Sequence, residues 1–149
     1  MLAASLTAWL LAACSPGADD LTGEVDGVVV DVVDGDTIDV EGVGRVRLVG
    51  VDTPEIGDCG YGEARAQLAA LVLGESVVLV PGGVDDRDRY DRLLRYVDVD
   101  GMDAGLLLIE EGLAVSRYDS RDGYGEHTRE QEYVQADAGA TDDRLCPAG

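Results

Sequence analysis

Short apolar runs broken by glycine, proline and aspartate form the main pattern of this chain after residue 24. Between Arg45 and Val49 charged and apolar residues alternate, so a strand would place Arg45, Arg47 and Val49 on one face and Val46 and Leu48 on the other. Similar runs, bounded by turn residues, predict five strands: Val28–Val33, Thr37–Val40, Arg45–Val51, Ser76–Val80 and Leu93–Val99.

Helical spacing of apolar residues marks three further segments. Tyr61–Leu73 is expected to be a helix that ends before Gly74, and Met102–Glu111 a second one. The Thr128-Arg129-Glu130-Gln131 sequence has the spacing of a capping box, which predicts a third helix through about Ala138. Five short strands with one helix between the third and fourth predict an α+β, mainly β fold: a five-stranded Greek-key barrel of the OB type with three helices.

The N-terminal segment differs from the rest of the chain because it is uncharged and mostly apolar. The run from Leu2 to Ala13 is too short to span a bilayer, and it resembles the apolar region of a secretory signal. Leu11-Ala12-Ala13-Cys14 resembles the lipobox of bacterial lipoproteins, although no basic residue precedes Arg45. We therefore expect a signal peptide at 1–13, lipidation of Cys14, a linker at 14–23, the folded domain at 24–138 and a tail at 139–149.

This division predicts an exported protein, either anchored by its lipid at the cell surface or in the periplasm, or secreted. Cys59 and Cys146 would then form an even pair in an oxidising compartment. A bridge between them would stabilise the fold by about 4 kcal/mol in the chain-entropy model. Two free thiols are the alternative.

Charge narrows the possible functions. The chain carries 31 acidic residues and 11 basic ones, all arginine, for a net charge of −20. Such a surface repels polyanions at low salt, which argues against broad electrostatic binding of nucleic acid. Any activity on nucleic acid must come from a compact local site, with a few arginines directed inward.

One stretch could form such a site. Asp34-Gly35-Asp36 reads as a tight turn, because glycine permits positive φ and aspartate bonds to its own backbone. Carboxylates and guanidiniums alternate with apolar residues from there to Glu55, as a site for a hard cation and a phosphate would require. A solvated acidic hairpin with incidental arginines is the other interpretation of this stretch alone.

Four motifs lie in order along the chain: Val33-Asp34-Gly35-Asp36-Thr37, Arg47-Leu48-Val49-Gly50-Val51-Asp52-Thr53-Pro54-Glu55, Asp88-Arg89-Tyr90-Asp91-Arg92-Leu93-Leu94-Arg95-Tyr96 and Glu111-Gly112-Leu113-Ala114. Together they resemble the thermonuclease, or staphylococcal-nuclease-like, family in motif order across roughly residues 25–133. The resemblance implies a calcium-dependent phosphodiesterase that cuts DNA and RNA and leaves 3′-phosphates.

The resemblance also implies roles for single residues. Ca²⁺ would be held by the carboxylates of Asp36 and Asp52 and the backbone carbonyl of Thr53, which are hard oxygen donors. Glu55 would act as the general base on the attacking water. The scissile phosphate would be bound by Arg47 and Arg92, a terminal phosphate by Arg89 and Tyr90, and the sugar and base by Tyr118.

Three departures from the family pattern concern substrate affinity. The loop from Glu55 to Tyr61 is short, basic residues for an extended substrate are absent, and Asp91 stands where glycine is common. The alternative function is a non-catalytic OB-fold domain that binds nucleic acid or a partner protein. Retention of the whole set of acidic and arginine residues favours the enzyme, whose partners would be nucleic acid and, through the lipid anchor, a membrane. We expect a monomer.

Other charged residues are expected to have structural roles. His127 is predicted to lie at the surface or next to a helix cap. Arg65, Arg95 and Arg117 are predicted to pair with carboxylates of the same chain.

Overall fold

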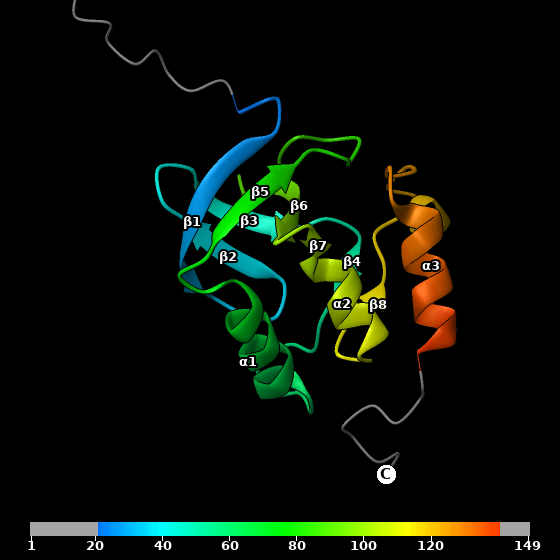
Figure 1. Cartoon of the computed structure of the whole chain (residues 1–149). Coiled ribbons are helices and arrows are strands. Elements are labelled where there is room, and N and C mark those ends of the chain that lie inside the picture. Colours follow the sequence, from blue (N-terminus) through cyan, green and yellow to red (C-terminus); the bar gives the residue numbers. More distant parts are fainter. Residues whose placement is uncertain (1–20, 141–149) are drawn as a thin grey trace, which may run out of the picture.

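A computed structural model describes residues 21–140; the expected signal peptide, Cys14 and Cys146 lie outside this part of the chain. Its centre is a closed barrel (Figure 1). Each strand pairs antiparallel with its neighbours except where β3 and β6 close the barrel side by side in parallel. Around the barrel the strands are β3 (Gly44–Leu48), β2 (Thr37–Val40), β1 (Val25–Val32), β5 (Ser76–Val80) and β6 (Leu93–Val99). The predicted five-stranded barrel is therefore confirmed.

The barrel interior is filled by aliphatic side chains. Val29 and Val32 of β1 are both buried and Val30 between them is exposed, although a regular strand would place residues three apart on opposite faces. The register of β1 against β2 shifts between Val29 and Asp31, which marks an irregularity in β1. Ile38, Val46, Leu79 and several others complete the core, which between residues 21 and 140 contains no Phe or Trp.

Three α-helices cover the described part of the barrel: α1 (Tyr61–Val72), α2 (Ala104–Glu110) and α3 (Glu130–Gly139). In Figure 1, α1 lies below the barrel, and α2 lies between α1 and α3, in agreement with their contacts. The described region also contains the short strands β4 (Val51–Asp52), β7 (Met102–Asp103) and β8 (Val115–Ser116) and a 3-10 turn, η1 (Ser120–Asp122). None of the helices between residues 21 and 140 is long and apolar enough to cross a membrane.

The predicted strand from Arg45 to Val51 is interrupted. It ends at Leu48, and the chain turns at Gly50, whose φ of 73° is accessible mainly to glycine. A Cβ at Gly50 would also lie 2.5 Å from Nε2 of His127. The chain then resumes as β4, which pairs with β8 outside the barrel. After this turn the chain leaves the barrel, and Asp52 and Glu55 come to lie at the same end of the barrel as Arg47.

The predicted capping box of the third helix is wrong. The helix begins after Arg129, and no side chain caps it. Thr128 instead donates its hydroxyl to the Tyr96 Oη, 3.3 Å away. The second helix begins two residues later than predicted, because Asp103 caps it by accepting the Leu106 amide at 3.1 Å.

His127 is buried, at 3% exposure, so the expectation of a surface position is wrong. Its alternative place next to the cap of α3 is confirmed, because its carbonyl accepts the Glu130 amide at the start of the helix. Its Nδ1 lies 2.7 Å from the Tyr96 hydroxyl, and its ring packs edge-on to Tyr133. Burial lowers the pKa of His127, against the opposing pull of the Glu130 charge and more distant carboxylates. His127 thus belongs to the contact between the barrel and α3.

Candidate active site

The turn between β1 and β2 holds the first carboxylate of the site. Asp34 accepts the Asp36 amide through Oδ1 at 3.1 Å, which closes the turn and directs Asp36 inward. Gly35 does not have positive φ, contrary to the expectation for this turn. Its role is steric, because a Cβ there would lie 2.7 Å from Thr53 Oγ1 and 2.9 Å from the Ala64 Cβ. Burial, and after it the neighbouring Asp36 charge, raises the pKa of Asp34.

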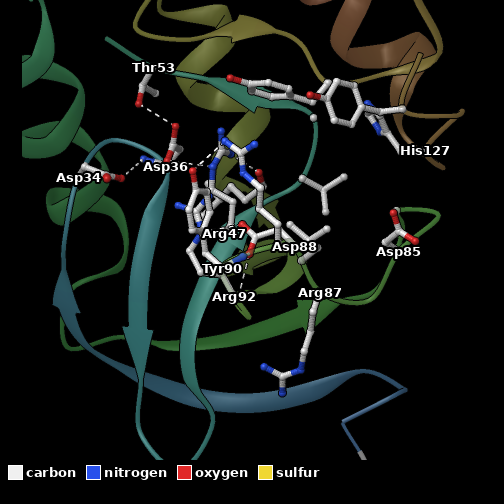
Figure 2. Close-up of a pocket in the computed structure, with 18 of the residues that line it drawn as sticks. Asp34, Asp36, Arg47, Thr53, Asp85, Arg87, Asp88, Tyr90, Arg92 and His127 are labelled. Atoms are coloured by element: carbon white, nitrogen blue, oxygen red, sulfur yellow. Dashed lines mark hydrogen bonds and ion pairs between the residues drawn. The ribbon is translucent and has the colours of Figure 1, made fainter. Parts of the chain in front are cut away.

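Asp36 contacts three other residues of the site through its carboxylate and is buried, at 8% exposure (Figure 2). Its Oδ1 accepts the Thr37 hydroxyl at 3.0 Å and pairs with Arg47 Nε at 3.2 Å. Its Oδ2 accepts the Thr53 hydroxyl at 3.0 Å. The turn, β3 and the segment after β4 are therefore joined through one carboxylate.

The guanidinium of Arg47 on β3 is held by backbone carbonyls at the end of β3 and the start of β4. Its Nη1 donates to the Leu48 carbonyl at 2.6 Å and its Nη2 to the Val51 carbonyl at 2.8 Å. With Nε directed at Asp36, three of the five N–H donors of this guanidinium are engaged. The plane of the group is thereby fixed, and two donors remain for a ligand.

Arg92 enters the same cleft from the turn before β6. Oδ2 of Asp88 accepts its Nε at 2.6 Å, while Oδ1 accepts the amides of Tyr90 and Arg92 at 2.9 and 3.0 Å. Nη1 of Arg92 lies 3.4 Å from the Thr37 hydroxyl, so Arg92 and Arg47 are linked through Thr37 and Asp36. Burial raises the pKa of Asp88, but the three hydrogen bonds and the Arg92 charge outweigh it and lower that pKa overall.

Arg89 and Tyr90 lie at the exposed tip of this turn. Arg89 donates to the Tyr90 hydroxyl at 2.7 Å and stacks over the ring at 4.8 Å, and Arg92 lies 5.4 Å from the same ring. Asp91, the next residue, adopts a φ of 63°, which explains why glycine suits this position.

Tyr118 follows β8 in a strained conformation, with a φ of 59°. Its hydroxyl donates to Asp52 Oδ1 at 3.3 Å, and the Arg47 guanidinium lies 5.5 Å from its ring. Tyr124 stacks edge-on against it at 5.4 Å. Burial, and then the Asp52 charge, raises the pKa of Tyr118.

These residues surround one cleft of about 560 Å³. Figure 2 shows Asp36 and Thr53 on one side and Asp85 and His127 on the other, with Arg47, Arg92 and Tyr90 between. Glu55 is exposed at the wall between this cleft and an adjoining groove of about 520 Å³. Asp52 and Cys59 line that groove rather than the cleft itself.

Nearly all of the sequence-predicted site residues therefore meet in or beside one cleft. Sequence reasoning missed Asp88, Thr37 and Tyr124. Asp88 and Thr37 lie within the family-like motifs, so the motifs could have identified them, whereas no motif includes Tyr124. Of the arginines expected to form ion pairs, Arg95 and Arg117 do so, and Arg65 bonds to backbone carbonyls instead.

The profile of the family described as staphylococcal nuclease homologue matches residues 45–146. The chain belongs to this family. The match begins at β3, so the Asp34–Thr37 turn lies outside it. The hydrogen bonds and ion pair of Asp36 attach that turn to the matched region.

Two of three similar curated proteins carry nuclease names. The chain is 33% identical over 145 residues to a micrococcal nuclease of Shigella flexneri, covering 89% of this chain and 76% of that protein. It is 35% identical over 107 residues to a thermonuclease of Staphylococcus intermedius, covering 66% of this chain and 63% of that protein. It is 39% identical over 100 residues to Protein ParB of Escherichia coli, covering 65% of this chain and 52% of that protein. The chain thus spans only about half to three quarters of these relatives.

Proposed function

We propose that this protein is a calcium-dependent nuclease that hydrolyses phosphodiester bonds of DNA and RNA and leaves 3′-phosphates. The observation that carries the proposal is the convergence of Asp36, Arg47, Glu55 and Arg92 on one cleft, in a chain of the staphylococcal nuclease family. The finer terms, calcium, both nucleic acids and 3′-phosphate products, come from the family resemblance.

The donor chemistry of the site fits a hard cation. Asp36 accepts two hydrogen bonds and forms an ion pair with Arg47, and only one of these contacts involves Oδ2, so that oxygen keeps a lone pair for a ligand. Asp52 and the Thr53 carbonyl would supply further oxygen donors. Among the described residues no three His, Cys, Asp or Glu side chains cluster as a metal site, so two carboxylates, a carbonyl and water would form this set. Bound Ca²⁺ would supply electrostatic stabilisation of charge on the phosphate oxygens.

The two arginines provide the same stabilisation from the protein. Arg47 is held by Asp36 and two carbonyls, and Arg92 is held by Asp88, so neither guanidinium needs to reorganise as charge develops on the phosphate. Each keeps free N–H donors in a fixed fork that matches phosphate oxygens.

Glu55 is the proposed general base. Its exposed carboxylate lines both the cleft and the groove that contains Asp52, so it can reach a water molecule beside the phosphate. It would take the proton of that water as the water attacks phosphorus. Arg89 and Tyr90 would contact a neighbouring phosphate, and Tyr118 would contact the sugar and base.

A non-catalytic binding domain remains the second candidate function. It would have no use for a guanidinium fixed by three partners beside a buried carboxylate. This feature favours the enzyme.

The test is degradation of single-stranded DNA by the full chain, with Ca²⁺ or with a chelator. Glu55→Gln is expected to lower kcat by about 100-fold or more, the scale of positioned acid–base groups, without lowering Tm. The matched control is Glu41→Gln, an exposed carboxylate in the β2–β3 turn. Equal activity of both variants, or full activity in the chelator, would contradict the proposal.

Export and lipidation of Cys14 stay proposals, as does the monomeric state. Metabolic labelling with a fatty acid in a bacterial host should label the protein, and Cys14→Ser should abolish the label. An unlabelled wild-type chain would exclude the anchor.

A further inference from the structure

The arginines of this chain are unevenly available to a polyanion. All 11 basic residues are arginines, and only Arg144 lies outside the described residues. Of the other ten, eight form ion pairs with carboxylates: Arg45, Arg47, Arg87, Arg92, Arg95, Arg117, Arg121 and Arg129. Arg65 donates to the carbonyls of Val32 and Val33, and Arg89 to Tyr90.

Outside the cleft, a phosphate would therefore meet guanidiniums whose charge is already balanced by a carboxylate, or that donate to backbone carbonyls. The Arg95–Asp86 and Arg121–Asp119 pairs show the difficulty, because one member of each is almost fully buried. A charge already neutralised within the protein contributes little to counterion release from nucleic acid. The described surface beyond the cleft thus offers no row of free cations for a strand to follow.

Inside the cleft, the free donors cover a short distance. Arg47 and Arg92 are joined through Asp36 and Thr37, so their remaining N–H groups serve one phosphate. Arg89, at the tip of the next turn, can serve a second. Arg87 is held by the side chain of Asp91 at 3.7 Å and by its carbonyl at 2.8 Å.

Exposed carboxylates lie at the far side of the cleft and in the adjoining groove, and these two places are called its exits below. Figure 2 shows Asp85 at the side of the cleft away from Asp36. Asp58 lines the adjoining groove, and both residues are exposed. The cleft volume of about 560 Å³ is that of a small-molecule site.

We infer that the substrates of this enzyme are short single-stranded oligonucleotides held at two neighbouring phosphates, and that nucleotides beyond these add no affinity. This inference rests on the proposed nuclease function and specifies its substrate. Once salt has screened the net charge, it predicts that the logarithm of the binding constant falls against the logarithm of salt concentration with a slope of about −1.4, the value for two phosphate contacts on a single strand.

The test separates binding from cleavage. The full chain carrying Glu55→Gln is titrated, with Ca²⁺, into labelled oligothymidylates of about 3, 6, 12 and 24 nucleotides, a range that brackets known single-strand site sizes. After correction for the number of binding registers, Kd should stay within about threefold across the series. A larger fall of Kd with length would reveal a basic track and overturn the inference.

Two double variants test the carboxylates at the exits. Asp58→Lys with Asp85→Lys should make Kd fall with length, whereas the control, Asp26→Lys with Glu75→Lys, has the same charge change at exposed sites outside the cleft and groove and should not. Equal effects of the two pairs would mean that overall charge, not the exits, limits the footprint. Length-independent binding by a wild-type chain that cuts none of these oligonucleotides would support the footprint and refute the nuclease.

Discussion

Asp88 is expected to act on the reaction only through Arg92. Its Oδ2 accepts Arg92 Nε at 2.6 Å in a pair in which both side chains are about three quarters shielded from solvent. In Asp88→Asn, Oδ1 still accepts the two turn amides, but the new NH₂ group faces the Nε–H donor. The turn should therefore persist while Arg92 becomes free to change rotamer.

The magnitude follows from that lost restraint. Ordering a free arginine side chain costs up to about 2 kcal/mol, which would be required at each binding of a phosphate. At about 1.4 kcal/mol per factor of ten, kcat/KM should fall by about 10- to 30-fold. The control is Asp39→Asn, which breaks the Arg45 pair, where Asp39 accepts Nε and Nη2 at 2.9 and 3.0 Å. It should leave kcat/KM unchanged.

The assay is initial rate on a short oligonucleotide with Ca²⁺, for both variants and for Asp88→Asn combined with Arg92→Lys. If Asp88 acts by positioning Arg92, Asp88→Asn should cause no further loss of kcat/KM in the Arg92→Lys background. An undiminished effect of Asp88→Asn in the Arg92→Lys background would refute the reasoning. Because the pKa of Asp88 is lower in the folded protein than its usual value of about 3.8, Asp88 contributes fully to stability above that value. This contribution is lost as pH falls through the lower folded-state pKa.

Four further predictions concern stability and salt. Gly35→Ala should destabilise the fold by about 1–3 kcal/mol through overpacking against Thr53, whereas Gly62→Ala, in open space on α1, should raise Tm; equal effects in thermal melts would exclude the steric reason. Because burial lowers the pKa of His127, its stabilising contribution is present above about pH 6.5 and is lost as pH falls through the folded pKa. The free energy of unfolding, measured with urea, should therefore decrease less between pH 7 and pH 5 in His127→Gln than in wild type. Native protein should show no reactive thiol at Cys59 until reduction, which should lower Tm; a thiol titrating before reduction would exclude a bridge. With Ca²⁺ saturating, the rate on single-stranded DNA should rise from low salt to a few tenths molar as the net charge of −20 is screened, so a steep fall from the lowest salt would contradict the short footprint.

The sequence by itself determined the barrel and the candidate residues. Short apolar runs bounded by turn residues placed all five barrel strands, because each strand must bury at least one face. The four motifs identified Asp36, Arg47, Glu55 and Arg92 through their resemblance to the family, since the stretch from Asp34 to Glu55 alone also fitted a structural hairpin. Local signals were less reliable at helix starts, where the Thr128 hydroxyl is used by Tyr96 instead of a cap.

Only the tertiary structure decided which partners these residues have. Gly35 is required for the space beside Thr53 and Ala64, residues that meet it only after the turn packs against the chain around α1. His127 is buried because the barrel and α3 close around it, which no local pattern could indicate. The partners of the described arginines, which are carboxylates, carbonyls and the Tyr90 hydroxyl, likewise depend on packing. Some pairs are local, as between Arg92 and Asp88, whereas Arg129 pairs with Asp98 and Asp103, which only the whole fold brings within reach.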